Sequence, residues 1–356
     1  MRQEYETGVQ ITQIFKVGVL GFQSHRDDFA ISFAEKEMRR RLAEFVNPAV
    51  TDDDLSRRYG LKDNRDWSLS HARKAALEEQ NDGVMKVDYR PFDTRWGEFS
   101  EIAMDYPRRE LLDHVAHRDN QCLNVVRQTK ARNWQHVLVS DKPTPAGFIE
   151  IKDGSTVFPL RLFRWSGTGD EVGENFKTEF RSFVDSRYAR HYLPEEILGY
   201  IYAVLHAPFY RTRYSEFLRT NFPRIPFAEM PADFIALSKL GWQLVDAHLL
   251  RDVPQRGFAQ YNGKGDHAVE AVRYSQVEQA IWINASQRFA PVPQNVWDFH
   301  IGGYRVLEKY LKSRKGRKLS LDEINHVAQV ADSLAFTIEQ MAKIDTAYKA
   351  AFPDRG

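Results

Sequence analysis

The spacing of apolar positions changes character near the middle of the chain. Between residues 84 and 165, apolar residues form short runs in the segments VMKVDYRPF, CLNVVRQT, HVLVSD, FIEI and TVFPLRLF. Runs of this length, bounded by polar and turn residues, are typical of β-strands. Beyond residue 175, apolar residues recur every three or four positions, which is the period of an amphipathic helix. The pattern therefore predicts the α+β class, with an N-terminal mixed α/β, strand-rich core followed by a mainly helical C-terminal region.

The helical region carries recognisable start and stop signals. Pro194, followed by two glutamates, predicts a helix start, and Pro208 predicts an interruption. A second amphipathic pattern covers residues 234–250. Ser320 and Glu323 form a capping-box pattern that opens a long terminal helix. The apolar positions of this helix alternate in steps of three and four, so we expect it to pack lengthwise against another helix: Ile324, Val327, Ala331, Leu334, Ile338 and Met341.

The first part of the chain mixes short apolar segments with polar helical stretches. Strands are predicted at Ile11–Phe15, Val17–Phe22 and Phe29–Phe33. Residues 51–77 predict two short helices separated by Gly60, a spacing that suggests a DNA-reading helix-turn-helix. Because the second segment lacks a clean recognition face, a pair of connecting helices is the preferred interpretation.

Composition divides the chain into three predicted parts. Residues 1–83 hold the N-terminal strands and connecting helices, residues 84–175 the strand-rich core, and residues 176–356 the mainly helical region. The polar, glycine-rich stretch Ser166–Asn175 is expected to be a loop at the second boundary. Within the helical part, Val269–Tyr274 and Ala280–Asn284 predict a return to strands.

Bulk composition narrows the class of protein. The 42% hydrophobic and 13% aromatic content predicts a folded globular chain. No apolar run approaches the ~18 residues of a membrane span, and no secretory signal is apparent. Cys122 is the only cysteine, which excludes an internal disulfide and a thiolate metal cluster. These features predict a cytoplasmic protein without a membrane partner.

Catalytic motifs are weak. Glu150 and Lys152, with Asp141 upstream, match the end of a PD-ExK nuclease motif, but short matches of this kind on strands are common by chance. His114, His117 and Cys122 have a spacing that a metal can use, yet no second pair accompanies them. Neither an Asn/Asp-Pro-Pro-Tyr/Phe methyltransferase motif nor a helicase motif occurs. We therefore expect no catalytic residues, no metal and no cofactor, and a chain that binds rather than catalyses.

Four segments of the chain together resemble one protein family. They are Tyr89–Trp96, Val157–Phe163, Pro194–Phe227 and Ile281–Ser320. In order and spacing they are similar to the C-terminal specificity (target-recognition) region of Type ISP restriction–modification enzymes, from about residue 5 to about residue 345. The residues 97–99 (Gly-Glu-Phe) depart from the family, which often has a second aromatic pair there.

The resemblance implies that the chain recognises a short sequence in double-stranded DNA. Its implied partners are the adenine methyltransferase and translocase modules of the same enzyme, either in the same polypeptide or as a separate chain. A helical scaffold that docks such a module with little DNA contact is the alternative. A degenerate nuclease that uses Asp141, Glu150 and Lys152 is a more distant alternative.

Basic residues concentrate between Arg305 and Lys318, which we name the basic segment. Seven basic residues and one acid, Glu308, give a local net charge of +6, against +1 for the whole chain. Such a run indicates either an anionic partner or a solvated helix end. With the resemblance, DNA phosphate contact is the preferred interpretation for its seven members: Arg305, Lys309, Lys312, Arg314, Lys315, Arg317 and Lys318.

Other candidate DNA contacts lie in the strand-rich core. Arg90 and Arg95 flank Asp93, which can orient an arginine either as part of the scaffold or toward a base edge. Base-reading residues are expected in loops such as 128–135 or 142–154. The candidates with suitable donors are Arg127, Lys130, Arg132, Asn133 and Gln135. Arg211 and Arg213, next to Tyr210 and Tyr214, are instead expected to form a buried aromatic–arginine contact between helices.

Overall fold

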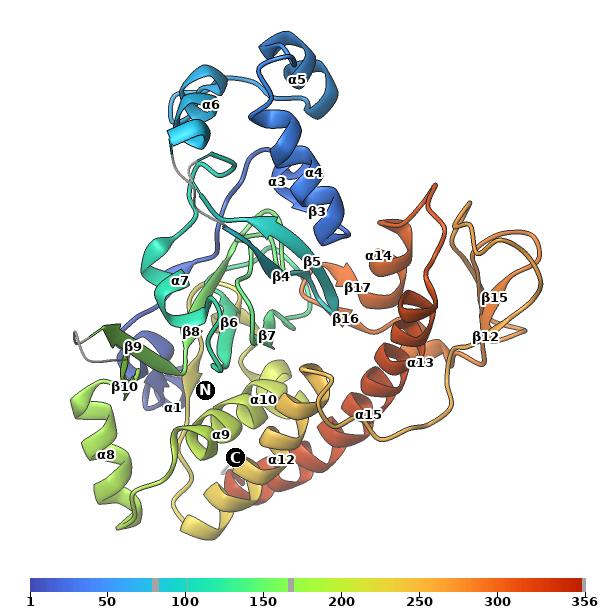
Figure 1. Cartoon of the computed structure of the whole chain (residues 1–356). Helices are drawn as coiled ribbons and strands as arrows, with labels where there is room; N and C mark the ends of the chain where they lie inside the picture. The colour runs from blue at the N-terminus through green and yellow to red at the C-terminus, as the bar shows by residue number, and fades with distance from the viewer. Residues whose placement is uncertain (79–82, 101, 166–169, 354–356) are drawn as a thin grey trace.

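The computed structural model of the chain describes residues 1–78, 83–100, 102–165 and 170–353. It combines several small antiparallel sheets with layers of helices, so the predicted α+β class is confirmed (Figure 1). The predicted long terminal helix is α15 (Leu321–Ala351), which runs from beside a small C-terminal sheet to the helices at the bottom of the view (Figure 1).

A four-stranded antiparallel sheet lies at the centre of the molecule. Its strands stand in the order β2 (Val19–Leu20), β8 (Ser155–Pro159), β6 (Cys122–Val126) and β7 (Val137–Ser140). Strands β6 and β7 are buried along their whole length, which explains their unbroken apolar runs. Leu123 and Val125 of β6 share one core with Tyr200 and Ile201 of the helical layer. The strand-rich and helical parts are therefore joined by a common core, and the domain boundaries stay a prediction.

The N-terminal part differs locally from its predicted strands. Residues Ile11–Ile14 form the short helix α2 because Gln10 and Gln13 build a capping box at its start, so the strand predicted at Ile11–Phe15 is wrong. The other two predicted strands shorten to β2 and to β3 (Ile31–Ser32). The elements around them are α1 (Arg2–Glu6), β1 (Val9–Gln10), α3 (Asp27–Ala30) and α4 (Glu35–Phe45). Strand β3 extends the hairpin of β4 (Val84–Arg90) and β5 (Asp93–Glu98).

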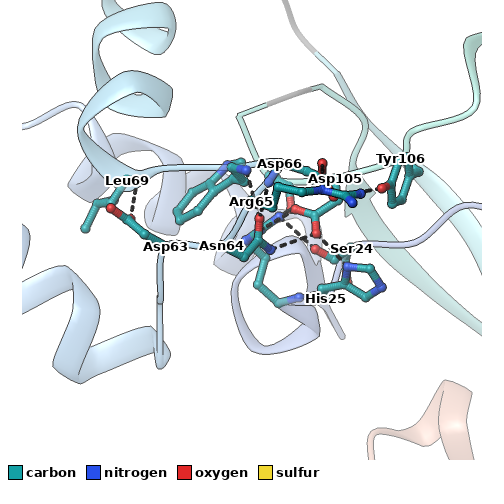
Figure 2. A network of polar contacts seen from close by, with 12 residues as sticks. Ser24, His25, Asp63, Asn64, Arg65, Asp66, Leu69, Asp105 and Tyr106 are labelled. Carbon is teal, nitrogen blue, oxygen red and sulfur yellow. Dashed lines mark hydrogen bonds and ion pairs between the residues drawn. The ribbon is translucent and has the colours of Figure 1, made fainter.

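Helices α5 (Asp52–Tyr59) and α6 (Leu69–Glu78) are joined by residues 60–68, a linker longer than the roughly three to four residues of a helix-turn-helix. A polar network anchors this linker. Asp105 forms hydrogen bonds with His25 and Arg26, each at 2.5 Å, and with Asn64 at 2.9 Å. Figure 2 shows His25 and Asn64 pointing toward Asp105. The interpretation of this region as connecting helices is confirmed.

Helix boundaries in the helical layer occur at the predicted prolines, since α9 (Pro194–His206) begins at Pro194 and α10 (Pro208–Arg213) begins at Pro208. The layer also contains α8 (Thr178–Tyr188), α11 (Ser215–Leu218) and α12 (Pro231–His248). A Cβ atom on Gly241 of α12 would lie 1.8 Å from the carbonyl oxygen of Gly199 in α9. The two helices thus touch backbone to backbone, which requires glycine at this crossing. Among the described helices, none combines the length and the apolar character that a membrane span needs.

The predicted capping box of α15 is confirmed. The Ser320 side chain accepts a hydrogen bond from the Glu323 amide at 3.1 Å, and the Glu323 carboxylate accepts one from the Ser320 amide at 2.9 Å. The helix packs against α12, and the predicted apolar residues Val327, Ala331 and Leu334 are buried.

A second four-stranded sheet lies within the mainly helical region. Its strands, in the order of pairing, are β12 (Gln260–Asn262), β15 (Arg288–Ala290), β14 (Ala280–Trp282) and β13 (Arg273–Ser275). The strand predicted at Ala280–Asn284 thus exists but is shorter, whereas the one predicted at Val269–Tyr274 begins only at Arg273. Helix α13 (Gln294–Trp297), the hairpin of β16 (His300–Ile301) and β17 (Tyr304–Arg305), and helix α14 (Val306–Lys312) follow.

The stretch predicted as a loop at residues 166–175 is partly a strand. Strand β10 (Asp170–Glu174) pairs with β9 (Arg161–Trp165), so the prediction is wrong there, because pairing with a neighbouring strand overrides the polar composition. Residues 166–169 lie outside the described residues. Helix α7 (Arg109–Val115) precedes strand β6 in the chain.

Candidate nucleic-acid interface

Most side chains of the basic segment have carboxylate partners. Four of them form ion pairs with acids that mostly lie outside the segment: Arg305 with Asp298 (3.2 Å) and Glu308 (3.6 Å), Lys312 with Glu308 (2.8 Å), Arg317 with Glu323 (3.4 Å), and Lys318 with Asp266 (2.9 Å). These four side chains are still between 32% and 68% exposed. Within the described part of the chain, Lys309 and the exposed Lys315 have no carboxylate at ion-pair distance. The local charge of +6 is therefore largely offset by neighbouring carboxylates, most of which lie just outside the segment.

The Arg314 side chain is buried in the protein interior and is not available at the surface. It is 3% exposed and donates hydrogen bonds to Asp93 at 2.9 Å and to Glu323 at 2.8 Å. Two N–H groups of Arg95 bind the other oxygen of Asp93, at 2.7 and 3.0 Å. Burial would raise the pKa of Asp93, but Arg314 and Arg95 hold it below its usual value. The prediction that Arg314 contacts a phosphate therefore fails on burial, and Asp93 acts as scaffold between the β4–β5 hairpin and the start of α15.

Arg90 and Lys309 lie near one aromatic ring, that of Tyr304. The Arg90 guanidinium lies 5.9 Å, and the Lys309 ammonium 5.4 Å, from the centre of the Tyr304 ring. Arg90 is buried and stacks on Tyr89 at 3.9 Å. Burial lowers the pKa of Lys309, and the charges of Arg90 and Arg95 lower it further. Like charges held this close favour the arrival of an anion.

Residues 127–135, which we name the recognition loop, present free donors from a fixed base. Arg127, Lys130, Arg132 and Asn133 are exposed, and none of their side chains has a hydrogen bond or ion pair to any described residue. The base is anchored by Thr129, whose amide donates to the Arg219 carbonyl at 3.0 Å. The following Trp134 and His136 are buried. The loop thus offers unpaired hydrogen-bond donors without the entropy cost of ordering its backbone.

Two further turns meet the recognition loop at the same edge. The amide of Gly302, between β16 and β17, donates to the Gln135 carbonyl at 2.8 Å, and the amide of Gly303 donates to the Ile149 carbonyl at 3.2 Å. A Cβ atom on Gly302, where φ is +54°, would lie 2.2 Å from the Ile149 carbonyl oxygen. The Gly-Gly pair therefore permits a close approach of loops inside the protein. Lys142, at the start of the other predicted reading loop, pairs with Asp88 (3.6 Å) and with Asp141.

The nuclease-like residues Asp141, Glu150 and Lys152 each have contacts within the protein. Glu150 and Lys152 lie in a turn, not on the predicted strand, and the Lys152 amide lies 3.4 Å from the Glu150 carboxylate. Asp141 forms ion pairs with Lys142 and with Arg251. In the described residues, no group of three or more His, Cys, Asp or Glu side chains is arranged to hold a metal ion.

The aromatic–arginine contact expected at residues 210–214 forms only in part. Arg213 pairs with Glu4 at 2.9 Å, and the Tyr210 hydroxyl donates to the Arg224 carbonyl at 2.7 Å. Arg211 turns the other way, toward Trp134 behind the recognition loop, with 5.7 Å between its guanidinium and the ring centre. The sequence carried no signal for this placement, because residues 211 and 134 are far apart in the chain.

The family and the fold are both found among known proteins. The family model "Type ISP C-terminal specificity domain" matches residues 13–343. No curated protein matches the chain significantly. The ATP-dependent Type ISP restriction–modification enzyme LlaBIII bound to DNA has a similar fold, with a TM-score of 0.73 and 14% identity over 96% of this chain and 24% of that chain. A DrdV–DNA complex has a TM-score of 0.73 and 21% identity over 93% of this chain and 36% of that chain. A nuclease-deletion mutant of the Type ISP enzyme LlaGI with a DNA substrate mimic has a TM-score of 0.68 and 18% identity over 97% of this chain and 29% of that chain. The chain thus spans between about a quarter and just over a third of these proteins.

Proposed function

Because the chain belongs to the family of Type ISP C-terminal specificity domains, we propose that it recognises a short sequence in double-stranded DNA. The family predicted from the sequence is thereby confirmed. A specificity domain selects the site and leaves the chemistry to other modules. The chain on its own is therefore proposed to be non-catalytic and to use no cofactor.

The observation that carries this proposal is the recognition loop with its unpaired donors. An arginine can bind the O6 and N7 atoms of guanine, and an asparagine can bind adenine, in the major groove. We propose that Arg127, Lys130, Arg132 and Asn133 make such contacts. Their lack of internal partners leaves these donors available without breaking any contact of the free protein.

Phosphate contacts are proposed for the basic side chains that keep an exposed or uncompensated charge. Exposed ion pairs contribute little to stability, roughly 0–1 kcal/mol, so their basic members can exchange a carboxylate for a phosphate at small cost. Arg314 and Arg95 are excepted, because Asp93 holds them in the interior. The proposed backbone contacts are Arg90, Arg305, Lys309, Lys312, Lys315, Arg317 and Lys318.

Further modules are part of the proposal. The similar folds are found in chains between about three and four times as long, two of which are named as Type ISP enzymes. We propose that the chain places the duplex for an adenine methyltransferase module and works with a translocase module, in the same polypeptide or as a separate chain. Such an assembly acts on DNA in the cytoplasm.

The test is duplex DNA binding as a function of salt, followed by sequence selection. Each phosphate neutralised by the protein steepens the fall of log K with log salt by about 0.9. We expect a clear slope with any short duplex, and enrichment of one sequence from a random pool. Enrichment that persists unchanged in an Arg132→Ala/Asn133→Ala variant would place base reading elsewhere. A wild-type chain that shows no salt-dependent binding favours the helical scaffold.

A further inference from the structure

Arg211 is a half-buried cation without a counter-ion. Its Nε donates to the Leu205 carbonyl at 2.5 Å, and its guanidinium lies beside the Trp134 ring. No described carboxylate lies at ion-pair distance from it. Burial lowers the pKa of Arg211 to about 10, so the side chain still carries its charge at neutral pH.

Three of the four buried arginines in the described part of the chain have acidic partners, and the fourth, Arg90, stacks on the Tyr89 ring. Arg26 pairs with Asp105 at 2.5 Å, Arg181 with Glu174 at 2.8 Å, and Arg314 with Asp93 at 2.9 Å. A charge withdrawn from water without a partner is costly in free energy, because the protein interior solvates it poorly. Arg211 therefore resembles one half of an ion pair whose other half is absent from the free protein.

Trp134 brings an unsatisfied donor to Arg211, and Arg219 carries a second one. The indole N–H of Trp134 is buried and has no acceptor among the described residues, and the same holds for Nε of Arg219. Arg219 contacts the recognition loop through its carbonyl, which accepts from the Thr129 amide. His136, next to Trp134, adds no positive charge, because burial and Arg211 lower its pKa to about 4.

Basic side chains predominate on the loop side of this site, although Glu150 and Asp153 lie near His136. The recognition loop, whose Trp134 lies beside Arg211, carries Arg127, Lys130 and Arg132, none of which is paired with a described acid. The nearby Glu150 lies 3.8 Å from His136. An anion that approaches the base of the loop thus meets several cations and the unsatisfied indole N–H of Trp134.

We propose that Arg211 binds a phosphate of the DNA backbone at the base of the recognition loop. The inference rests on the DNA recognition proposed above and adds a contact that fixes the loop against the duplex. The phosphate supplies the anion that the free protein lacks, while the loop side chains contact the bases.

The test compares Arg211→Met with Arg213→Met in the full chain, using a short duplex of arbitrary sequence. Methionine keeps the apolar stem of arginine and removes its charge. For Arg211→Met we expect the salt slope to fall by about 1 and the affinity at low salt to fall roughly tenfold to a hundredfold. For Arg213→Met, which loses the contact with Glu4, the salt slope should stay at the wild-type value.

Thermal unfolding of the free protein separates a phosphate contact from a structural role. Removal of an uncompensated charge should leave the Tm of Arg211→Met equal to or above that of the wild type. A lower Tm together with an unchanged salt slope would show that Arg211 only supports the fold. If Arg211→Met does not fold, Arg211→Lys and Arg211→Gln replace it, and the slope should be kept by lysine and reduced by glutamine.

The two proposals fail in different ways. If the wild type binds DNA with a salt-dependent affinity and neutral substitutions of Arg211 leave the slope unchanged, the inference is wrong and DNA recognition stands. If the wild type shows no salt-dependent binding, DNA recognition itself is overturned, and the phosphate contact with it.

Discussion

The basic segment and the recognition loop are both rich in positive charge, yet their charges meet different partners. In the basic segment, Arg314 is buried between two acids, and most of the other basic side chains pair with carboxylates. In the recognition loop, Arg127, Lys130 and Arg132 have no described partner, although the loop has a lower density of basic residues than the basic segment. The region with the higher charge density is thus the one with less charge to offer a ligand.

The difference comes from what the fold packs against each region. The basic segment spans α14 and the turn that leads to α15. Asp266 from the loop after β12, Asp298 at the end of α13 and Glu323 of α15 reach it there. The recognition loop projects from the end of β6, and its anchors, Trp134 and His136, point into the protein. Charge density along a chain therefore indicates a binding surface only after internal ion pairs have been subtracted.

The largest expected effect concerns the buried ion cluster that occupies part of the basic segment. Asp93→Ala leaves Arg314 and Arg95 buried without their shared carboxylate. We expect the free energy of unfolding to fall by about 3–5 kcal/mol, as measured by urea denaturation. The control is Asp298→Ala, which removes an exposed partner of Arg305 and should change stability by no more than about 0.5 kcal/mol. If the two substitutions lowered the free energy of unfolding equally, the buried ion cluster would contribute no more to stability than the exposed ion pair.

The next effect concerns sequence preference in the recognition loop. Arg132→Ala and Asn133→Ala should each reduce discrimination against wrong base pairs by about 1–3 kcal/mol, with little change in stability. Selection from a random duplex pool, followed by titration of the enriched sequence and of single mismatches, measures this. Lys315→Ala is the matched control, because a phosphate contact carries no sequence information. If only Lys315→Ala reduced the preference for the selected sequence, the basic segment would read the bases and the recognition loop would not.

A third prediction concerns the base of the recognition loop at acidic pH. Burial lowers the pKa of His136 from 6.5 to about 4, so the folded state holds this side chain neutral where the unfolded chain is protonated. The stabilising contribution is complete above about pH 6.5 and is lost as the pH falls toward 4. Between neutral pH and about pH 5, we expect His136 to account for a loss of up to about 2 kcal/mol of unfolding free energy. In urea denaturation, a His136→Asn variant should lose less stability than the wild type over this interval.

The smallest expected effect concerns the exposed lysines of the basic segment. Lys312→Ala and Lys315→Ala should each reduce the salt slope of duplex binding by about 1, uniformly across sequences, while stability changes by less than about 0.5 kcal/mol. Lys16→Ala, on the exposed surface of the N-terminal part, is the control and should leave the slope unchanged. If neither lysine alters the slope, the backbone contacts lie only around the recognition loop.

Local signals in the sequence predicted much of the fold. Pro194, Pro208 and the pair Ser320 and Glu323 mark helix boundaries that the structure confirms, because each acts on backbone groups within a few residues. Strand prediction was less successful near Ile11, where a capping interaction produced a helix, and at residues 170–174, where pairing with β9 produced a strand. Strand pairing depends on partners that a local pattern does not contain.

The candidate site, like the fold, was determined partly by local sequence and partly by contacts between distant residues. The sequence by itself determined the family and the α+β class. It also showed that residues 127–133 carry side-chain hydrogen-bond donors of the kind that can bind base edges. Only the tertiary structure decided which charges remain available. It brought Asp93 to Arg314 across 221 positions of the chain, and it placed Arg211 beside Trp134 with no described carboxylate at ion-pair distance. The physical reason is that the charge available to a ligand depends on burial and on ion pairs between distant residues, and both exist only once the chain has folded.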